Sequence, residues 1–517
     1  MLTLVPQPSS VVEKDGFFKL SDATIFSVSE ELKKIAYSFL CQINKATGFQ
    51  YSVKKGKQGD VQFLLDESLD GLGDEGYQLE VTPKSVVLKA VSPAGIFYGT
   101  RTLLQLLPVA ILRDAEVSDV AWEIPCVSIT DQPRFGWRGM MLDCCRHFMP
   151  KEFVKKFINL LAFYKMNRFH WHLTEDQGWR IEIKQYPKLT EIGSYRSETA
   201  VDKTWQTENI VYDRKPEWGF YTQDDVKEIV AYASERFITV VPEIEMPGHC
   251  QAALAAYPEL GNSGKKLSVL PQWGVNQDVF NVEDSTIEFL KNVLSEVLDL
   301  FPSEFIHVGG DECPKDQWRA SEAAQAKMEK LGLQDEDELQ SWFIRQMDQF
   351  LTENGRRLVG WDEILEGGLA ANATVMSWRG EKGGIAAAKA GHDVVMAPHQ
   401  YVYFDHNQHQ MQVDSEVRIG GLITLEDVYG YEPIPAEMSE EEAQHVLGAQ
   451  GQIWTEYMKN SKEVEWMAFP RILALAEVLW SPKDMKDYER FSKRFPHLLQ
   501  QLDLMDVKYY RLFEIAD

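Results

Sequence analysis

From Phe135 onward, short apolar runs alternate with amphipathic helical segments, and this alternation limits the possible folds more than any other feature of the sequence. Strands that alternate with helices form parallel sheets, because each helix returns the chain to the same edge of the sheet. Eight such units favour a (β/α)8 barrel, and a doubly wound sheet is the alternative. The eight strands are expected at residues 138–145, 168–173, 238–244, 305–308, 358–361, 375–378, 394–397 and 447–454. The helices expected between them include residues 152–164, 224–236, 285–300, 338–353 and 462–480.

The barrel is preferred because polar and aromatic residues gather at the C-terminal ends of nearly all the expected strands. Active sites of (β/α)8 barrels lie at that face of the fold. We therefore expect a functional site built from the residues that directly follow the strands.

Residues 1–130 have a different pattern and are expected to form a separate small α/β domain ahead of the barrel domain at residues 131–517. The acidic, irregular stretch 113–123 and the turn at residues 131–133 mark the boundary between them. The expected elements of the small domain are helices at residues 29–46 and 92–107 and strands at residues 77–81 and 85–90.

The chain of 517 residues is acidic, because 53 Lys and Arg stand against 79 Asp and Glu and leave a formal net charge of −26. Such a surface repels phosphate backbones and anionic lipids, so nucleic acids and membranes are poor candidates for partners. The most apolar stretch, residues 103–112, is too short to span a bilayer. The first residues lack the features of a signal peptide, so we expect a soluble protein that is cytoplasmic, or exported with its leader removed. Monomer and homodimer both remain open.

The sharpest chemical signal follows the fourth expected strand, where Gly309 and Gly310 precede two adjacent acids, Asp311 and Glu312. Glycines at a strand end allow close backbone approach and unusual dihedral angles. Two neighbouring carboxyl groups at a crowded rim favour a protonated form for one of them, which is what general acid catalysis needs at neutral pH. We therefore interpret Asp311 and Glu312 as catalytic candidates rather than as a solvated pair at the start of a helix.

Charged residues also follow the first three expected strands. Arg146 follows the first strand, where its guanidinium group can donate two hydrogen bonds to vicinal hydroxyls or form a structural ion pair with Asp143. The second strand leads to Asp176, and the third leads to His249, which can ligate a metal, relay a proton or orient a carboxylate. The sequence has no H-E-x-x-H or comparable set of ligands, so we expect no metal and no other cofactor.

Aromatic residues recur at the ends of the later strands. Pyranose C–H faces pack on indole rings, so tryptophans at successive strand ends indicate pocket walls more than core packing. Tyr403 and Asp405 are two residues apart and project on the same side of an extended segment. The carboxylates of Asp405 and Glu456 near the mouth suit a neutral polyhydroxyl ligand. The three tryptophans are Trp361, Trp378 and Trp454.

Together these residues resemble glycoside hydrolase family 20, the β-N-acetylhexosaminidases, over essentially the whole chain. The H-x-G-G-D-E motif of that family is His307-Val308-Gly309-Gly310-Asp311-Glu312 here. The segment GTRTLLQ at residues 99–105 resembles part of the non-catalytic domain of the family. Departures are small: Glu175 stands where the family often has Asp or Asn, and Cys250 stands where a small hydroxyl residue is common.

The resemblance implies a role for each candidate. Glu312 would be the general acid/base, Asp311 would hold and polarise the 2-acetamido group of the substrate, and Tyr403 would donate a hydrogen bond to the acetamido carbonyl. The three tryptophans would enclose the acetamide and the sugar ring. The implied hydroxyl-binding residues are Arg146, Asp405 and Glu456, and the implied polar network beside Glu312 consists of Asp176 and His249.

The resemblance also implies a mechanism. Ordinary retaining glycosidases place two carboxylates roughly 5–5.5 Å apart across the scissile bond, and one of them is the nucleophile. Asp311 and Glu312 are sequence neighbours, which does not suit that arrangement, whereas family 20 uses the acetamido oxygen of the substrate as the nucleophile and forms an oxazolinium ion. We therefore expect an exo-β-N-acetylhexosaminidase that releases terminal GlcNAc or GalNAc from glycans or chito-oligosaccharides. The alternatives are a related exo-glycosidase such as a lacto-N-biosidase, and a non-catalytic sugar-binding protein.

Overall fold

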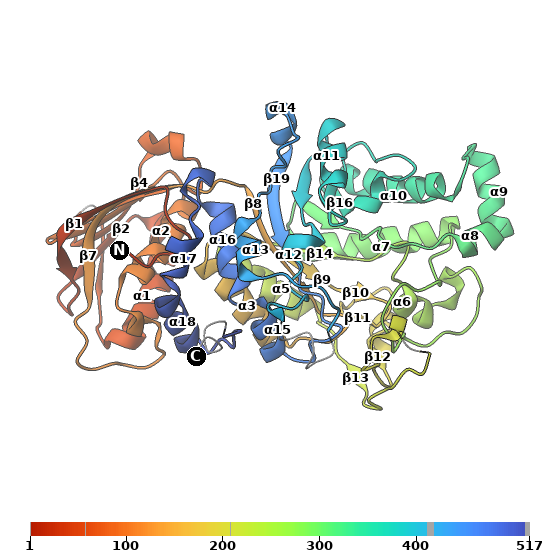
Figure 1. The fold of residues 1–517 in the computed structure, drawn as a ribbon, viewed down its shortest axis with the longest axis horizontal. Coiled ribbons are helices and arrows are strands. Elements are labelled where there is room, and N and C mark those ends of the chain that lie inside the picture. The colour runs from red at the N-terminus through yellow and green to blue at the C-terminus, as the bar shows by residue number, and fades with distance from the viewer. Residues whose placement is uncertain (1, 57, 207, 411–417, 512–517) are drawn as a thin grey trace.

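The computed structural model describes residues 2–56, 58–206, 208–410 and 418–511, and its largest part is a closed eight-stranded barrel (Figure 1). Every pair of neighbouring strands in the barrel is parallel. Each strand overlaps one of those expected from the sequence, so the (β/α)8 barrel is confirmed and the doubly wound sheet is excluded. In order around the barrel the strands are β8 (Trp137–Asp143), β9 (Arg168–His172), β14 (Thr239–Glu243), β15 (Phe305–His307), β16 (Arg357–Trp361), β17 (Thr374–Ser377), β18 (Val394–Met396) and β19 (Val446–Gly451).

Amphipathic helices surround the barrel, and each buries one apolar face. In α7, for example, Ile287, Leu290 and Leu294 are buried, as the spacing of its apolar residues predicts. The prediction of one helix at residues 462–480 is wrong, because Pro470 has no N–H group to continue the helix and the chain forms two helices on either side of it. The main helices are α3 (Lys151–Phe163), α5 (Gln223–Ser234), α7 (Asp284–Leu300), α10 (Glu336–Glu353), α11 (Lys382–Lys389), α15 (Ser461–Ala468) and α16 (Arg471–Trp480).

Shorter elements decorate the loops of the barrel and the end of the chain. They are β10 (Thr174–Glu175), β11 (Gly178–Trp179), α4 (Lys188–Glu191), β12 (Tyr195–Arg196), β13 (Glu217–Trp218), α6 (Gln251–Ala256), α8 (Asp316–Ala320), α9 (Glu322–Leu331), α12 (His399–Val402), α13 (Leu425–Gly430), α14 (Glu440–Ala443), α17 (Tyr488–Ser492) and α18 (Phe495–Leu504).

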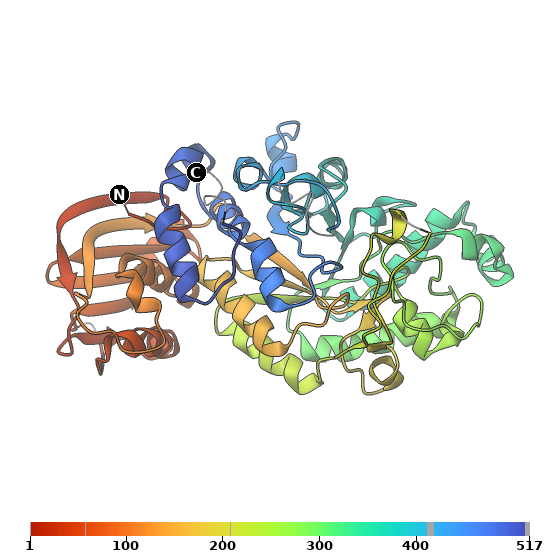
Figure 2. The ribbon, with the colours of Figure 1, turned by 60° about the horizontal axis from the view of Figure 1, so that its bottom comes forward.

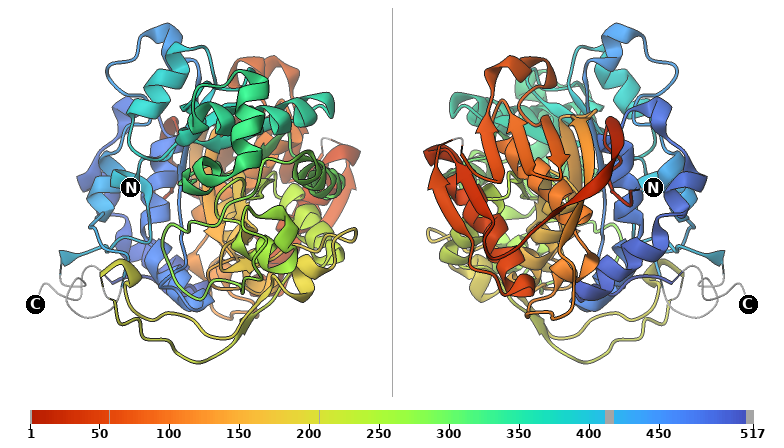
Figure 3. Two further views of the ribbon diagram at one scale, coloured as in Figure 1. Left: turned by 90° about the vertical axis from the view of Figure 1, so that its right-hand side faces the viewer. Right: turned by 90° about the vertical axis from the view of Figure 1, so that its left-hand side faces the viewer.

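Ahead of the barrel, the chain forms a seven-stranded mixed sheet. Helices α1 (Lys33–Thr47) and α2 (Pro93–Leu106) lie between this sheet and the barrel (Figures 1 and 3). The two helices and the two strands expected here are present, and Ser92 caps α2 by accepting a hydrogen bond from the Ala94 N–H. The sequence did not predict the other five strands. In spatial order the strands are β1 (Ser10–Lys19), β7 (Glu123–Asp131), β5 (Tyr77–Thr82), β6 (Ser85–Ala90), β4 (Val61–Leu65), β2 (Ile25–Val28) and β3 (Ser52–Lys55).

Buried polar groups join the N-terminal sheet to the barrel. Asp131, the last residue of β7, pairs with Lys165 at 2.9 Å and accepts a hydrogen bond from the Trp480 indole at 2.9 Å. Arg138 of β8 pairs with Glu75 at 2.7 Å. Figure 2 shows α17 and α18, near the C-terminus, lying beside this N-terminal unit. The last strand of the sheet along the chain, β7, ends at Asp131. The boundary between the two domains at residue 130 stays a prediction.

None of the helices in the described part of the chain is both long enough and apolar enough to cross a membrane.

Candidate active site

Nine of the eleven predicted site residues line one cavity of about 230 Å³ at the C-terminal ends of the barrel strands. A larger cavity of about 530 Å³ contains none of them, so we place the candidate site in the smaller cavity. Asp176 and His249 do not line the cavity. His249 lies behind Asp311 and Glu312, and Asp176 contacts His249. The lining residues are Arg146, Asp311, Glu312, Trp361, Trp378, His399, Tyr403, Asp405, His406, Ile419, Trp454 and Glu456.

The backbone after β15 turns sharply to bring the two acids to the cavity. Gly309 and Gly310 have φ angles of +67° and +92°, which side chains disfavour, and Glu312 has a φ of +43°. A Cβ atom on Gly309 would lie only 1.7 Å from Oε2 of Glu245. Both the dihedral angle and the close approach of Glu245 therefore require glycine at position 309.

One imidazole connects the two acids. Nε2 of His249 lies 3.6 Å from Oδ2 of Asp311 and 3.5 Å from Oε2 of Glu312. Behind it, Nδ1 of His249 lies 2.8 Å from Glu175 and 3.4 Å from Asp176. Burial disfavours the imidazolium, but the negative charges of Glu175 and Asp311 outweigh it and raise the pKa of His249 well above its ordinary value. His249 is therefore a buried cation shared by four carboxylates.

The two adjacent acids differ in their pKa. Burial raises the pKa of Asp311 to about 6, against the opposing effect of His249. The interaction with His249 lowers the pKa of Glu312, whose side chain is 39% exposed and so loses less hydration. Asp311 therefore has the higher pKa of the two acids, and it is the one that holds a proton at mildly acidic pH.

Arg146 forms the ion pair with Asp143 that the sequence left open, and it also lies at the cavity. It lines the cavity, and its guanidinium group pairs with Glu175 at 3.0 Å and with Asp143 at 3.5 Å. It also donates a hydrogen bond to Gln177 and lies 4.9 Å from the ring centre of Trp454. The ion pairs therefore fix the orientation of a guanidinium group that faces the cavity.

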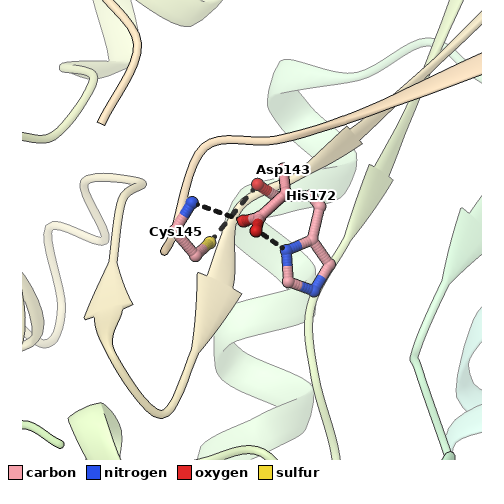
Figure 4. Close-up of side chains that lie close together, drawn as sticks. All are labelled: Asp143, Cys145 and His172. Carbon is pink, nitrogen blue, oxygen red and sulfur yellow. Dashed lines mark hydrogen bonds and ion pairs between the residues drawn. The ribbon is translucent and has the colours of Figure 1, made fainter. Parts of the chain in front are cut away.

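A buried cluster of Asp143, Cys145 and His172 holds the loop that carries Arg146 (Figure 4). Asp143 accepts a hydrogen bond from the Cys145 N–H at 2.7 Å and lies 3.3 Å from Nδ1 of His172. Cysteine, histidine and aspartate also occur together in nucleophilic sites. Here, however, the three side chains are fully buried, and burial raises the pKa of the Cys145 thiol to about 11. The thiol therefore stays protonated, and the cluster is structural.

Aromatic rings form the walls of the cavity, and buried acids hold two of the indoles. Nε1 of Trp361 donates to Glu243 at 2.8 Å, and Nε1 of Trp378 donates to Glu363 at 2.9 Å. The Tyr403 ring stacks on Trp378 at 6.1 Å between centroids. These contacts hold the Trp361, Trp378 and Tyr403 rings in place as walls of the cavity.

Asp405 and Glu456 form a second acidic group at the cavity. Burial and the proximity of Glu456 raise the pKa of Asp405 well above its ordinary value, and burial also raises the pKa of Glu456. Oδ1 of Asp405 is buried and has no hydrogen-bond partner among the described residues. Such an atom suits a ligand hydroxyl as its donor.

The sequence missed the groups that support the cavity. Glu245 carries a carboxyl group whose pKa burial and Asp311 raise well above its ordinary value, and burial raises the pKa of Glu363 to about 8. Their positions in the sequence could have indicated them. Glu243 and Glu245 lie just before His249 in the sequence, and Glu363 lies two residues after Trp361. The missed lining residues are His399, His406 and Ile419, and no pattern in the sequence indicated them.

Comparison with known proteins places this site in a family. Residues 135–483 match the model of the glycosyl hydrolase family 20 catalytic domain, and residues 1–132 match domain 2 of the same family. A β-hexosaminidase of Porphyromonas gingivalis is 46% identical over 98% of this chain, which spans 64% of that relative. The structure of a family 20 β-N-acetylhexosaminidase from Streptomyces coelicolor is similar with a TM-score of 0.86 and 28% identity, covering 99% of this chain and 98% of that chain. A mutant Streptomyces plicatus β-hexosaminidase, solved in complex with the product GlcNAc, is similar with a TM-score of 0.86 and 28% identity, covering 99% and 97%. The chain therefore belongs to glycosyl hydrolase family 20.

Proposed function

We propose that this chain is a retaining exo-β-N-acetylhexosaminidase, which releases terminal β-linked GlcNAc or GalNAc from the non-reducing ends of glycans or chito-oligosaccharides. Family membership, the named relatives and the GlcNAc complex support this substrate class. The size of the cavity supports exo action, because about 230 Å³ is below the roughly 300–1,000 Å³ of sites for larger ligands and suits one sugar residue.

The observation that carries the mechanism is the position of the two acids on one wall. Asp311 and Glu312 are adjacent, and an oxygen of each lies within 3.6 Å of the same His249 nitrogen. Two adjacent acids on one wall do not suit a nucleophile and an acid that must stand on opposite sides of a glycosidic bond. In line with family 20 membership, we assign the role of nucleophile to the acetamido oxygen of the substrate, which attacks the anomeric carbon and gives an oxazolinium ion.

The two acids then have separate tasks. Glu312 protonates the leaving glycosidic oxygen and afterwards removes a proton from the attacking water. Asp311 accepts a hydrogen bond from the acetamido N–H and stabilises the positive charge that develops there, while Tyr403 donates to the acetamido oxygen. Trp361, Trp378 and the third indole, Trp454, enclose the acetamide and the sugar ring.

Asp311 supplies the proton that Glu312 needs. Below about pH 6 the pair of acids holds one proton, which resides mainly on Asp311. A bound substrate places an amide N–H against Asp311, which favours its ionised form, and covers Glu312, which favours its neutral form. Binding therefore moves the proton from Asp311 to Glu312, with the His249 imidazolium between them.

Hydroxyl groups of the sugar bind to the remaining polar residues. The buried oxygen of Asp405 and the carboxyl group of Glu456 accept hydrogen bonds, and the Arg146 guanidinium group donates them. Asp176 acts through His249, which it helps to keep charged. Residues 1–130 carry none of these groups, and we assign them to a non-catalytic domain.

A chromogenic β-N-acetylglucosaminide assay tests the proposal. We expect hydrolysis of nitrophenyl β-N-acetylglucosaminide or β-N-acetylgalactosaminide and release of GlcNAc from chitobiose. Cleavage of a nitrophenyl lacto-N-bioside without cleavage of either monosaccharide substrate would indicate a lacto-N-biosidase instead. Binding of GlcNAc without any turnover would indicate a sugar-binding protein.

A further inference from the structure

A third cavity, of about 420 Å³, lies where the N-terminal unit meets the barrel. Residues of α1, α2, α3, α5 and the end of α18 line it. Helix α3 leaves the C-terminal end of β8 and returns the chain to the N-terminal end of β9, so its last turns lie at the barrel face opposite the active site. This interdomain cavity is therefore separate from the catalytic one.

The interdomain cavity is cationic in an acidic protein. Its lining contains four cations and only two acids, and both acids are already paired: Asp114 with Lys45 at 2.9 Å, and Asp506 with Lys462, outside the cavity, at 2.8 Å. The arginines of the lining thus lack a carboxylate partner among the described residues. The four cations are Lys45, Arg101, Arg113 and Arg236.

Arg101 is the least compensated of these groups. It is only 6% exposed, and its guanidinium hydrogen bonds go to one neutral atom, Oγ1 of Thr100, at 3.2 and 3.3 Å. It lies 4.6 Å from the ring centre of Phe97, and no ion pair compensates its charge. Burial, reinforced by the positive charge of Arg236, lowers the pKa of Arg101 to about 9. A buried guanidinium group without an anionic partner is costly, and an anion bound in the cavity would compensate its charge.

We propose that the interdomain cavity binds a phosphate group, held by the guanidinium groups of Arg101 and Arg236. Planar guanidinium groups donate pairs of hydrogen bonds that match the oxygens of a phosphate, and Arg113 in the lining adds a further positive charge. The cavity also has apolar walls, formed by Leu160, Phe163 and Leu504, so it accepts a small phosphate monoester as well as inorganic phosphate. Because the ligand contacts both units, it strengthens their attachment to each other.

Isothermal titration of the full chain in chloride buffer tests the site, with inorganic phosphate, glucose 6-phosphate and neutral glucose as titrants. We expect saturable binding of at least one phosphate and none of glucose, and the ratio of the two phosphate affinities distinguishes the free ion from the ester. Arg101→Gln and Arg236→Gln should each weaken binding by roughly 10- to 100-fold. Arg345→Gln removes the same charge from an exposed position on α10 and should bind as the wild type does.

Thermal unfolding separates a ligand-binding arginine from a structural one. Without phosphate, Arg101→Gln should unfold at or above the temperature of the wild type, because the substitution removes an uncompensated buried charge. With phosphate, the wild type should gain stability and Arg101→Gln should not. Equal destabilisation of Arg101→Gln with and without phosphate, no phosphate binding by the wild type, or unchanged binding by both variants would each overturn the proposal.

Discussion

Raising the pH from 5 to 7 should lower kcat/KM for chitobiose about tenfold. In the proposed mechanism the free enzyme reacts in the form in which Asp311 and Glu312 together hold one proton, because Glu312 protonates the leaving oxygen. In the free enzyme that proton is lost from Asp311 as the pH rises through about 6. The alkaline limb of kcat/KM, which reports the free enzyme, should therefore lie near pH 6.

The magnitude follows from the shifted pKa. A group with a pKa of about 6 is roughly 90% protonated at pH 5 and roughly 10% protonated at pH 7. If Asp311 had an ordinary pKa, the limb would lie two units lower, and the rate would already be low at pH 5. The shift arises because the side chain is only 13% exposed and burial outweighs the attraction of the His249 imidazolium.

The assay measures initial rates of GlcNAc release from chitobiose between pH 4 and 8, and each sample is returned to pH 6 afterwards to verify that the enzyme survived. A nitrophenyl substrate serves as control and should show a smaller decline, since its leaving group needs little protonation. Asp311→Asn should move the limb to lower pH, because the remaining proton then sits on Glu312, whose pKa is lowered. A limb that stays near pH 6 in Asp311→Asn, or one that is absent in the wild type, would refute the reasoning.

Four further predictions concern individual groups. Glu312→Gln should lower kcat for chitobiose by roughly 10²–10⁴-fold and lower it less for nitrophenyl substrates; equal losses would remove Glu312 from the acid role. Arg146→Lys should raise KM although the charge is kept, because an ammonium group cannot pair with Glu175 and also donate a fork of hydrogen bonds; an unchanged KM would leave Arg146 purely structural. β-Glucosides without an acetamido group should hardly be cleaved, and a thiazoline analogue of the oxazolinium ion should inhibit tightly, whereas a covalent sugar adduct on a protein carboxylate, detected by mass spectrometry, contradicts the mechanism. Gly309→Ala should cost about 1–3 kcal/mol in denaturant unfolding, because its methyl group would meet Glu245 at a φ of +67°; an unchanged midpoint would show that the loop adapts.

The barrel could be predicted because its strands are buried on both faces and are therefore continuous apolar runs. β8, for example, is buried at every position. Two of the unpredicted strands of the N-terminal sheet lack that signal: β1 is exposed at most of its residues, and β3 has no buried residue. They form because neighbouring strands supply hydrogen bonds, and the pairing of β1 with β7 joins residues more than a hundred positions apart in the sequence.

The site could be predicted where one residue type at a strand end carries the chemistry, as with Asp311, Glu312 and the tryptophans. Its supporting acids depend on which strands become neighbours. β14 lies between β9 and β15, so Glu243 meets His170 at 2.8 Å and His307 at 2.9 Å. No local pattern specifies those distances, because the three residues come from three separate strands.

The different pKa values of two adjacent acids follow from their position around one cation. His249 lies nearly equidistant from Asp311 and Glu312, so its charge alone does not distinguish them. Asp311 is far more buried, and its pKa rises, whereas Glu312 keeps contact with solvent and its pKa falls. Solvent access therefore decides which acid holds the proton, and in the proposed mechanism a substrate changes that access by covering Glu312. The sugar that is proposed to present its acetamide to Asp311 would thus supply the condition under which Glu312 becomes the acid.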